Sequence, residues 1–226
     1  MKNLQEKSPI YYAEADIYEA FAQAEDAGGL VLAALTPLVK GKTVLDLGCG
    51  TGKYLELLAP HAAHITGIDA AGAQLDIARR KTAALGNVIL VHGDAADAQL
   101  PHAKYDVVLA CWMLGTIAEE TKQKAILTRF ALPGTRIILV ENAEGGEFED
   151  IRGRANDPLL RTRRYNDWLL GQGFAETHRL DAWFEFETAA QAREVFAVIW
   201  GEDKRPRVRD RRIEHKIAIY LRVIAI

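Results

Sequence analysis

Apolar runs of strand length alternate with segments of helical period from residue 43 to about residue 141. Strands that are apolar on both faces and separated by helices predict a parallel sheet covered on both sides, so the expected fold class is α/β. The predicted strands are Thr43–Leu47, His64–Ile68, Val88–His92, Tyr105–Ala110 and Arg136–Glu141. The predicted helices between them are Lys53–Ala59, Gly72–Leu85, a short piece near Ala95–Leu100, and Ile117–Phe130.

The pattern changes after Glu141. Residues 142–157 (NAEGGEFEDIRGRAND) are polar and rich in glycine, which predicts a loop. Asp157-Pro158 is typical of a helix start, and the following LLRTRRYNDWLLGQ predicts a helix that ends near Gly171 or Gly173. A strand over 175–188, a helix over 189–199, a basic loop over 201–212 and a last strand over 213–224 complete the chain.

Two helices, over 11–27 and 29–39, are expected ahead of the sheet. The first carries apolar residues at a helical period, which favours a lid that packs one face on the sheet. No internal repeat or linker interrupts the sequence. We therefore expect a single domain over 1–226, with a helical cap over 1–40 and a sheet core over 41–226 that ends in a strand–helix–strand unit.

Composition narrows the partners and the compartment. The net charge of −3 argues against a globally basic nucleic-acid binder. Two cysteines, Cys49 and Cys111, are not a disulfide framework and suit a reducing compartment. No apolar run is long enough to span a membrane, and MKNLQEKSPIYY lacks the apolar core of a signal peptide. These features predict a soluble cytoplasmic protein without a membrane partner.

A glycine turn divides the first predicted strand from its helix, in VLDLGCGTGKYLELLA (residues 44–59). Gly48, Gly50 and Gly52 would let a ligand approach bare backbone, with the amides of the turn and of the helix start facing it. The third glycine comes one residue too early for the G-x-G-x-x-G of dinucleotide-binding sites. No P-loop motif is present either. The turn therefore predicts a ligand other than a pyrophosphate.

Three acids accompany the turn: Asp46 lies inside the first strand, and Asp69 and Asp94 follow the second and third. Parallel strands end at one edge of the sheet, so Asp69 and Asp94 should border the same crevice. In that crevice Asp69 is placed to accept hydrogen bonds from both hydroxyl groups of a ribose. Asp94 could accept one from the exocyclic amine of an adenine. Aspartates at such positions also cap helices, but three together favour a nucleoside site.

With these acids, VLDLGCGTG resembles the class I S-adenosylmethionine-dependent methyltransferases of the small-molecule type, over residues 43–141. The resemblance implies a Rossmann-like sheet of order 3-2-1-4-5-7-6 with an antiparallel last strand, and S-adenosyl-L-methionine as cofactor. By position, Asp46 would brace the turn, Asp69 would hold the ribose and Asp94 would read the adenine. The implied cofactor-binding residues are Asp46, Gly48, Cys49, Gly50, Gly52, Asp69, Ala70, Gln74, Leu75, Asp94, Ala95, Ala110 and Cys111.

The methyl acceptor is expected above the ends of the fourth and fifth strands, beneath the first helix and the 142–156 loop. The pocket candidates are Tyr11, Tyr12, Tyr18, Trp112, Met113, Asn142, Glu144 and Phe148. Several of these also suit plain packing or turn roles. Methyl transfer from a sulfonium is an in-line displacement that needs a base only for a protonated or weakly nucleophilic acceptor. The catalytic residue stays unassigned, with Glu144 and Tyr11 as candidates.

The histidines and the basic run suggest no further site. His61 and His64 have no nearby partners for a zinc ion, so no metal is expected. His178 and His215 fall in the last strands and are expected at an exposed edge or face. The 204–212 run lacks interleaved aromatic residues, and ACWMLG replaces the (D/N)-P-P-(Y/F) of relatives that methylate amino groups on bases or glutamine. A small-molecule acceptor is therefore favoured over nucleic acid.

The sequence thus predicts a methyltransferase that uses S-adenosyl-L-methionine on a small organic or natural-product acceptor, as a monomer or homodimer. One alternative is an RNA or protein methyltransferase, which would use the basic surface. Another is a cofactor-binding but catalytically silent regulatory subunit. A nicotinamide dehydrogenase is disfavoured by the glycine spacing.

Overall fold

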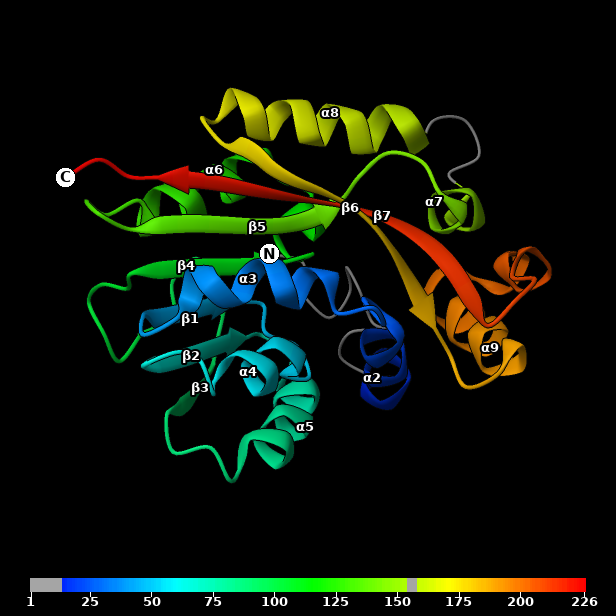
Figure 1. Cartoon of the computed structure of the whole chain (residues 1–226), viewed down its shortest axis with the longest axis horizontal. Helices are drawn as coiled ribbons and strands as arrows, with labels where there is room; N and C mark the ends of the chain where they lie inside the picture. Colours follow the sequence, from blue (N-terminus) through cyan, green and yellow to red (C-terminus); the bar gives the residue numbers. More distant parts are fainter. Residues whose placement is uncertain (1–13, 154–157) are drawn as a thin grey trace.

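The computed structural model describes residues 14–153 and 158–226, and the side chains of 154–161 are not described. Its centre is a seven-stranded sheet of order β3-β2-β1-β4-β5-β7-β6 (Figure 1). The strands are β1 (Thr43–Leu47), β2 (His64–Asp69), β3 (Val88–His92), β4 (Val107–Cys111), β5 (Arg136–Asn142), β6 (Ala175–Glu185) and β7 (Arg212–Val223). The first five pair in parallel, and β7 runs antiparallel to both β5 and β6. The expected strand order and the antiparallel last strand are confirmed.

Helices cover both faces of this sheet. They are α2 (Ala15–Ala24), α3 (Leu30–Val39), α4 (Lys53–Leu58), α5 (Gly72–Thr82), α6 (Glu120–Phe130), α7 (Glu147–Arg152), α8 (Pro158–Gly171) and α9 (Ala189–Trp200), with 3₁₀ turns η2 (Leu114–Thr116) and η3 (Glu202–Arg207). Alternate residues of one strand enter opposite cores. Val44 packs in the cluster that includes α3, α4 and α5, whereas Leu45 packs in the cluster that includes α6 and α8. No helix among the described residues has the length and apolar character that crossing a membrane requires.

A third core lies beyond the carboxyl ends of the parallel strands, where β6 and β7 extend past β5 toward α9 (Figure 1). We call it the aromatic cluster; its rings include Phe21 of α2, Phe148 of α7, Phe184 of β6, and Phe196 and Trp200 of α9. Phe184 lies at the centre of the cluster, because its ring centroid is 4.9 Å from the centroids of both Phe21 and Phe148. Residues near the beginning and near the end of the chain therefore pack together beside the carboxyl ends of the parallel strands.

The loop expected over 142–157 is wrong in part, because Glu147–Arg152 forms helix α7. Phe148 and Ile151 are three residues apart and are 4% and 6% exposed in the aromatic cluster, so burial of one helical face stabilises the short helix. Gly145 and Gly146 precede it at φ of 89° and 87°, values that favour glycine.

The short helix expected near Ala95–Leu100 is also wrong, since residues 95–97 form only a turn. The Asp94 carboxylate accepts the Ala96 amide at 2.9 Å, as in an Asx turn. Arg129 of α6 donates to the carbonyl oxygens of Ala95 and Ala98. These contacts occupy backbone groups that a helix would use itself. The fourth strand likewise begins at Val107 rather than Tyr105.

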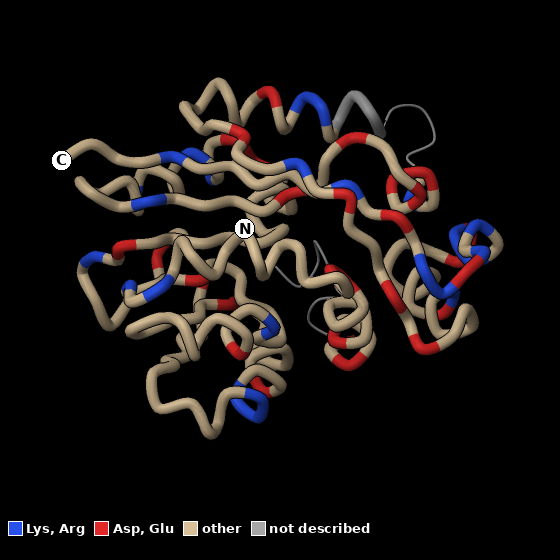
Figure 2. Tube along the Cα trace, in the orientation of Figure 1, with Lys and Arg blue, Asp and Glu red and all other residues tan. Residues whose placement is uncertain are grey.

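The basic run over 204–212 is partly neutralised by nearby acids, and Figure 2 shows positive and negative residues mixed there. Arg205 pairs with Glu202 at 2.7 Å and with Glu194 at 2.8 Å. Arg211 pairs with Glu185 at 3.0 Å. The run contains η3 and does not form a continuous basic face.

Two buried polar contacts fix the helices ahead of the sheet. Lys53, the first residue of α4, donates to the carbonyl oxygens of Ala22 at 2.7 Å and of Glu25, which caps the end of α2. Asp26, at φ 53°, accepts the amides of Val31 at 3.1 Å and Leu32 at 3.3 Å, which caps the start of α3. Helix α2, which was expected to be a lid, is thus capped by Lys53 and packed in the aromatic cluster. The division at residue 40 stays a prediction, and residues 11–13 of the expected helix lie outside the described residues.

We predict that Asp26→Ala lowers the free energy of unfolding by about 1–2 kcal/mol, the usual cost of losing a helix cap. Urea unfolding measures this change. Asp167→Ala removes an exposed aspartate from the surface of α8 and is the matched control, with an expected change within about 0.5 kcal/mol. Equal stability of the two variants would contradict the capping role.

Candidate active site

The glycine turn is fastened to the end of β2. The amides of Gly48 and Cys49 donate to the carbonyl oxygen of Ile68 at 2.8 and 3.0 Å. The Gly50 amide donates to Oδ2 of Asp69 at 2.8 Å. Gly48 and Gly50 adopt φ of 67° and 55°, so the chain can reverse here only because neither residue carries a side chain. The expected strand–turn–helix is therefore present, with α4 beginning at Lys53.

Side chains from three other segments lie over this turn. A Cβ on Gly50 would sit 3.0 Å from Oε1 of Gln74 and 3.4 Å from a ring carbon of Tyr18, and a Cβ on Gly48 would collide with Met113. Leu75 is fully buried in the core, and so are Cys49 and Ala110 apart from a few per cent of their surface. Of the expected cofactor-binding side chains, Asp69 is bonded to the turn at Gly50, and Gln74 also lies against Gly50.

The three acids at the strand ends have different surroundings. Asp69 accepts amides with both oxygens, from Gly50 and from Ala71 at 2.8 Å, and burial raises its pKa. Asp46 lies close by, and burial together with the Asp69 charge raises its pKa to about 8. Asp94 stands apart: burial opposes its ionisation, but Lys122 at 2.6 Å lowers its pKa on balance. A carboxylate has about four acceptor positions, so these contacts leave Asp69 and Asp94 able to bind a ligand as well.

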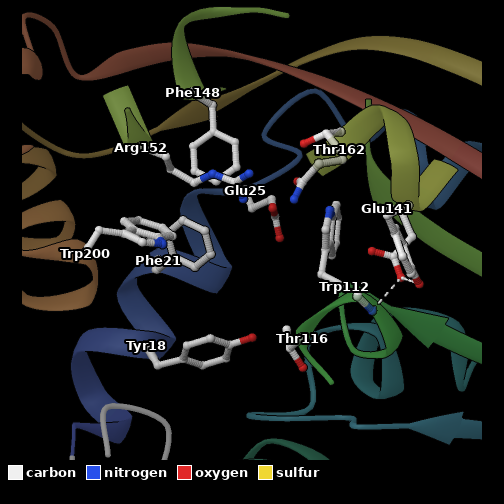
Figure 3. Close-up of a pocket in the computed structure, with 13 residues that line it drawn as sticks. Tyr18, Phe21, Glu25, Trp112, Thr116, Glu141, Phe148, Arg152, Thr162 and Trp200 are labelled. Atoms are coloured by element: carbon white, nitrogen blue, oxygen red, sulfur yellow. Dashed lines mark hydrogen bonds between the residues drawn. The ribbon is translucent and has the colours of Figure 1, made fainter. Parts of the chain in front are cut away.

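A cavity of about 260 Å³ opens at the carboxyl ends of β4 and β5 (Figure 3). It is lined mostly by aromatic rings and buried polar groups: Tyr18, Phe21, Glu25, Trp112, Gly115, Thr116, Glu141, Asn142, Phe148, Arg152, Thr162, Tyr165 and Trp200. Tyr18 lines the cavity and also touches the glycine turn, and its hydroxyl points toward Thr116 in Figure 3. The cavity and the turn are therefore neighbours.

Trp112 forms one wall of this cavity in a strained conformation. Its φ of 51° is unusual for a residue with a side chain, and its amide still donates to Val140 at 2.8 Å. The indole stacks on His215 with the ring centroids 6.0 Å apart. Its Nε1 atom is buried without a hydrogen-bond partner among the described residues.

Two buried carboxyl groups face the cavity from opposite sides. Burial raises the pKa of Glu141 to about 8, although Tyr165 Oη and the Gly115 amide donate to its Oε1 at 3.0 and 3.3 Å. Burial also raises the pKa of Glu25 to about 8, against the opposing charge of Lys53. Both carboxyl groups therefore hold a proton through much of the neutral range.

The cavity contains some of the expected acceptor-site residues but not others. Tyr18, Trp112, Asn142 and Phe148 line it, whereas Met113 packs on Gly48. Glu144 faces Arg163 at 3.7 Å and is not among the described lining residues. Tyr11 and Tyr12 lie outside the described residues.

Sequence reasoning missed the two buried acids, Arg152, Tyr165 and one histidine. The exposed position expected for His215 is wrong, since its side chain is 1% exposed. β7 continues beyond the parallel strands, where the aromatic cluster covers it. Ile213, His215, Ile217 and Ile219 alternate along one face of the strand, and this period of two was the available signal.

Residues 44–131 match the family model described as a methyltransferase domain. A demethylmenaquinone methyltransferase of Clavibacter sepedonicus is 34% identical over 103 residues, which are 46% of this chain and 42% of the relative. One of Staphylococcus aureus (strain MRSA252) is 30% identical over 108 residues, 46% of this chain and 45% of the relative. The matches thus span less than half the length of these curated relatives.

Among solved structures, a SAM-dependent methyltransferase from Thiobacillus denitrificans, in complex with S-adenosyl-L-homocysteine, shares the fold with a TM-score of 0.56. It is 23% identical, and the match covers 84% of this chain and 89% of that one. Residues 44–131 therefore match a methyltransferase domain, and the chain shares the fold of a solved S-adenosylmethionine-dependent methyltransferase.

Proposed function

We propose that this protein transfers a methyl group from S-adenosyl-L-methionine to a small organic acceptor with a planar ring, in the cytoplasm. The observation that carries this proposal is the aromatic cavity beside the glycine turn, which Tyr18 joins to it. Its volume of about 260 Å³ lies just below the ~300–1,000 Å³ typical of sites for drug-sized ligands. An acceptor of modest size is therefore favoured, held between aromatic faces.

The cofactor site fits such a ligand on three features of this chain. The turn carries no side chain at Gly48 and Gly50, Asp69 is fixed at the end of β2, and Asp94 follows β3. Asp69 would hold ribose hydroxyls and Asp94 an adenine amine. When bound, the cofactor supplies an electrophilic methyl group on a sulfonium.

Glu141 is the residue placed to take a proton from the acceptor. Tyr165 and Gly115 both donate to Oε1, and a Cβ on Gly115 would lie 2.9 Å from Oε2, so the second oxygen lies on the η2 side of the cavity. With a pKa of about 8, Glu141 acts as a base in the fraction of molecules that is ionised, and this fraction grows as the pH rises toward 8. The aromatic walls exclude water and orient the ring, which would supply the remainder of the rate enhancement.

The charge distribution favours a small molecule over RNA or an acidic protein surface. Two arginines of the 204–212 run, Arg205 and Arg211, pair with Glu194, Glu202 and Glu185, and acidic residues are mixed with basic ones there (Figure 2). The curated relatives act on demethylmenaquinone by their names, and a quinone is a planar acceptor of the kind that this cavity suits. The catalytically silent subunit remains the alternative to exclude by assay.

The test of the function is cofactor binding followed by methyl transfer. We predict that the protein binds S-adenosylhomocysteine in calorimetry and that Asp69→Asn weakens binding about 10- to 150-fold, because hydrogen bonds to a charged group contribute roughly 1.5–3 kcal/mol. Asp97→Asn, an exposed aspartate in the turn after β3, is the control and should bind like the parent.

Turnover is then measured as methyl incorporation into a panel of hydroxylated naphthalenes, quinols and hydroxylated naphthoquinones. Transfer to a member of the panel supports the proposal. Cofactor binding without transfer to these rings, to RNA or to protein would indicate the silent subunit. Transfer to RNA that weakens steeply with salt would indicate the nucleic-acid alternative.

We also predict how stability depends on the Glu141 carboxyl group. Its pKa is about 8 in the folded protein and near 4.5 when unfolded, so between these values the folded state holds a proton that the unfolded state has lost. Stability therefore falls as pH rises from about 5 to 8. Glu141→Gln cannot ionise and should show a smaller fall in thermal midpoint over that interval. Glu144→Gln should follow the parent, and an unchanged slope in Glu141→Gln would contradict the raised pKa.

A further inference from the structure

His215 is a buried, uncharged ring behind the cavity wall. It stacks on Phe184 with centroids 4.8 Å apart and meets the Phe148 ring edge-on at 4.6 Å. Burial, with the nearby charges of Arg152 and Lys53, lowers the pKa of His215 well below its ordinary value. A neutral imidazole has one nitrogen that donates and one that accepts. The groups beside the two nitrogens therefore determine which nitrogen of His215 donates a hydrogen bond and which one accepts.

Asn142 lies beside one nitrogen and Glu25 beside the other. Nε2 is 2.8 Å from Oδ1 of Asn142, and an amide oxygen only accepts, so Nε2 carries the hydrogen in this arrangement. Nδ1 is then a bare acceptor; it has no hydrogen-bond partner among the described residues, and Oε1 of Glu25 lies 3.5 Å away. Because the pKa of Glu25 is about 8, its carboxyl group carries a proton at neutral pH and is able to donate to Nδ1.

The orientation of Asn142 determines what the cavity offers a ligand. With Oδ1 facing His215, the two N–H groups of Nδ2 remain, and no described residue accepts a hydrogen bond from them. Asn142 lines the cavity at the end of β5. In the reverse orientation Nδ1 would donate to Glu25, whose protonated carboxyl group would accept through its carbonyl oxygen and leave its own O–H without His215 as an acceptor.

We propose that Glu25, His215 and Asn142 form a one-directional hydrogen-bond chain that makes Asn142 a donor to a carbonyl oxygen on the ring of the methyl acceptor. His215 is then a positioning residue, and Asn142 selects the substrate. This inference rests on the proposed function and extends it to a chemical class, planar rings that carry a carbonyl group. A ring without the carbonyl would leave a buried donor unsatisfied, which is how a polar site rejects an apolar analogue.

The first test is the tautomer of His215 in the full chain, read from the ¹⁵N shifts of its imidazole at pH 7. The signal is assigned by its loss in His215→Phe and, independently, in His215→Gln. His178→Gln removes an exposed histidine of β6 and is the control. The proposal expects a neutral ring with hydrogen on Nε2. A hydrogen on Nδ1, or a charged ring, would overturn it.

The second test compares two probes that differ by one carbonyl group, 1-indanone and indane, by saturation-transfer NMR. The parent protein should bind 1-indanone about 5- to 10-fold more tightly, the effect of one hydrogen bond. Asn142→Asp keeps the shape but replaces the donor by an acceptor, and it should lose this preference. Gln172→Glu makes the same amide-to-acid change after α8, away from the cavity lining, and should keep it.

Equal binding of the two probes by the parent, or a preference that survives in Asn142→Asp, would overturn the inference. Neither measurement involves methyl transfer. Failure of S-adenosylhomocysteine to bind, with the tautomer and the probe preference as expected, would support the chain of hydrogen bonds and contradict the methyltransferase function. If the cofactor binds and methyl transfer occurs without the probe preference, only the substrate class falls.

Discussion

The attachment of the glycine turn to the end of β2 is the constraint on which the rest of the site depends. Its bonds to Ile68 and Asp69 fix the direction in which α4 leaves the sheet. The first residue of that helix, Lys53, then holds the last carbonyl groups of α2. Tyr18, Phe21 and Glu25 of this region reach the cavity only in that position. The glycine turn and the part of the cavity wall that precedes α3 are thus held together by one set of contacts.

Buried acids are the second organising feature. Asp46, Glu25 and Glu141 lie in surroundings that raise each pKa to about 8. Burial of an ionisable group opposes folding, and these three carboxyl groups lie beside the glycine turn or in the lining of the cavity. The aromatic cluster offsets this cost by packing rings from both ends of the chain around Phe184.

Features that depend on neighbours along the chain were predictable, and features that depend on distant partners were not. The parallel strands and the glycine turn follow from residues within single β–α units, whereas the strand order was implied by the resemblance to a known family. Helix α7 forms because Phe148 meets rings from α2, β6 and α9, none of which its own sequence reveals. The turn after Asp94 depends on Arg129, more than thirty residues later. The burial of His215 likewise results from the extension of β7 beyond the sheet.

The distribution of the cavity lining along the chain has an evolutionary consequence. Of the described lining residues, only Trp112, Gly115 and Thr116 fall within residues 44–131, the segment that matches the methyltransferase domain. The other walls come from the helices before it and from the strands and helices after it. Under the proposed function, mutations in those outer segments would exchange one acceptor for another without altering the glycine turn. Two proteins that share this segment can therefore diverge in substrate while their shared residues remain unchanged.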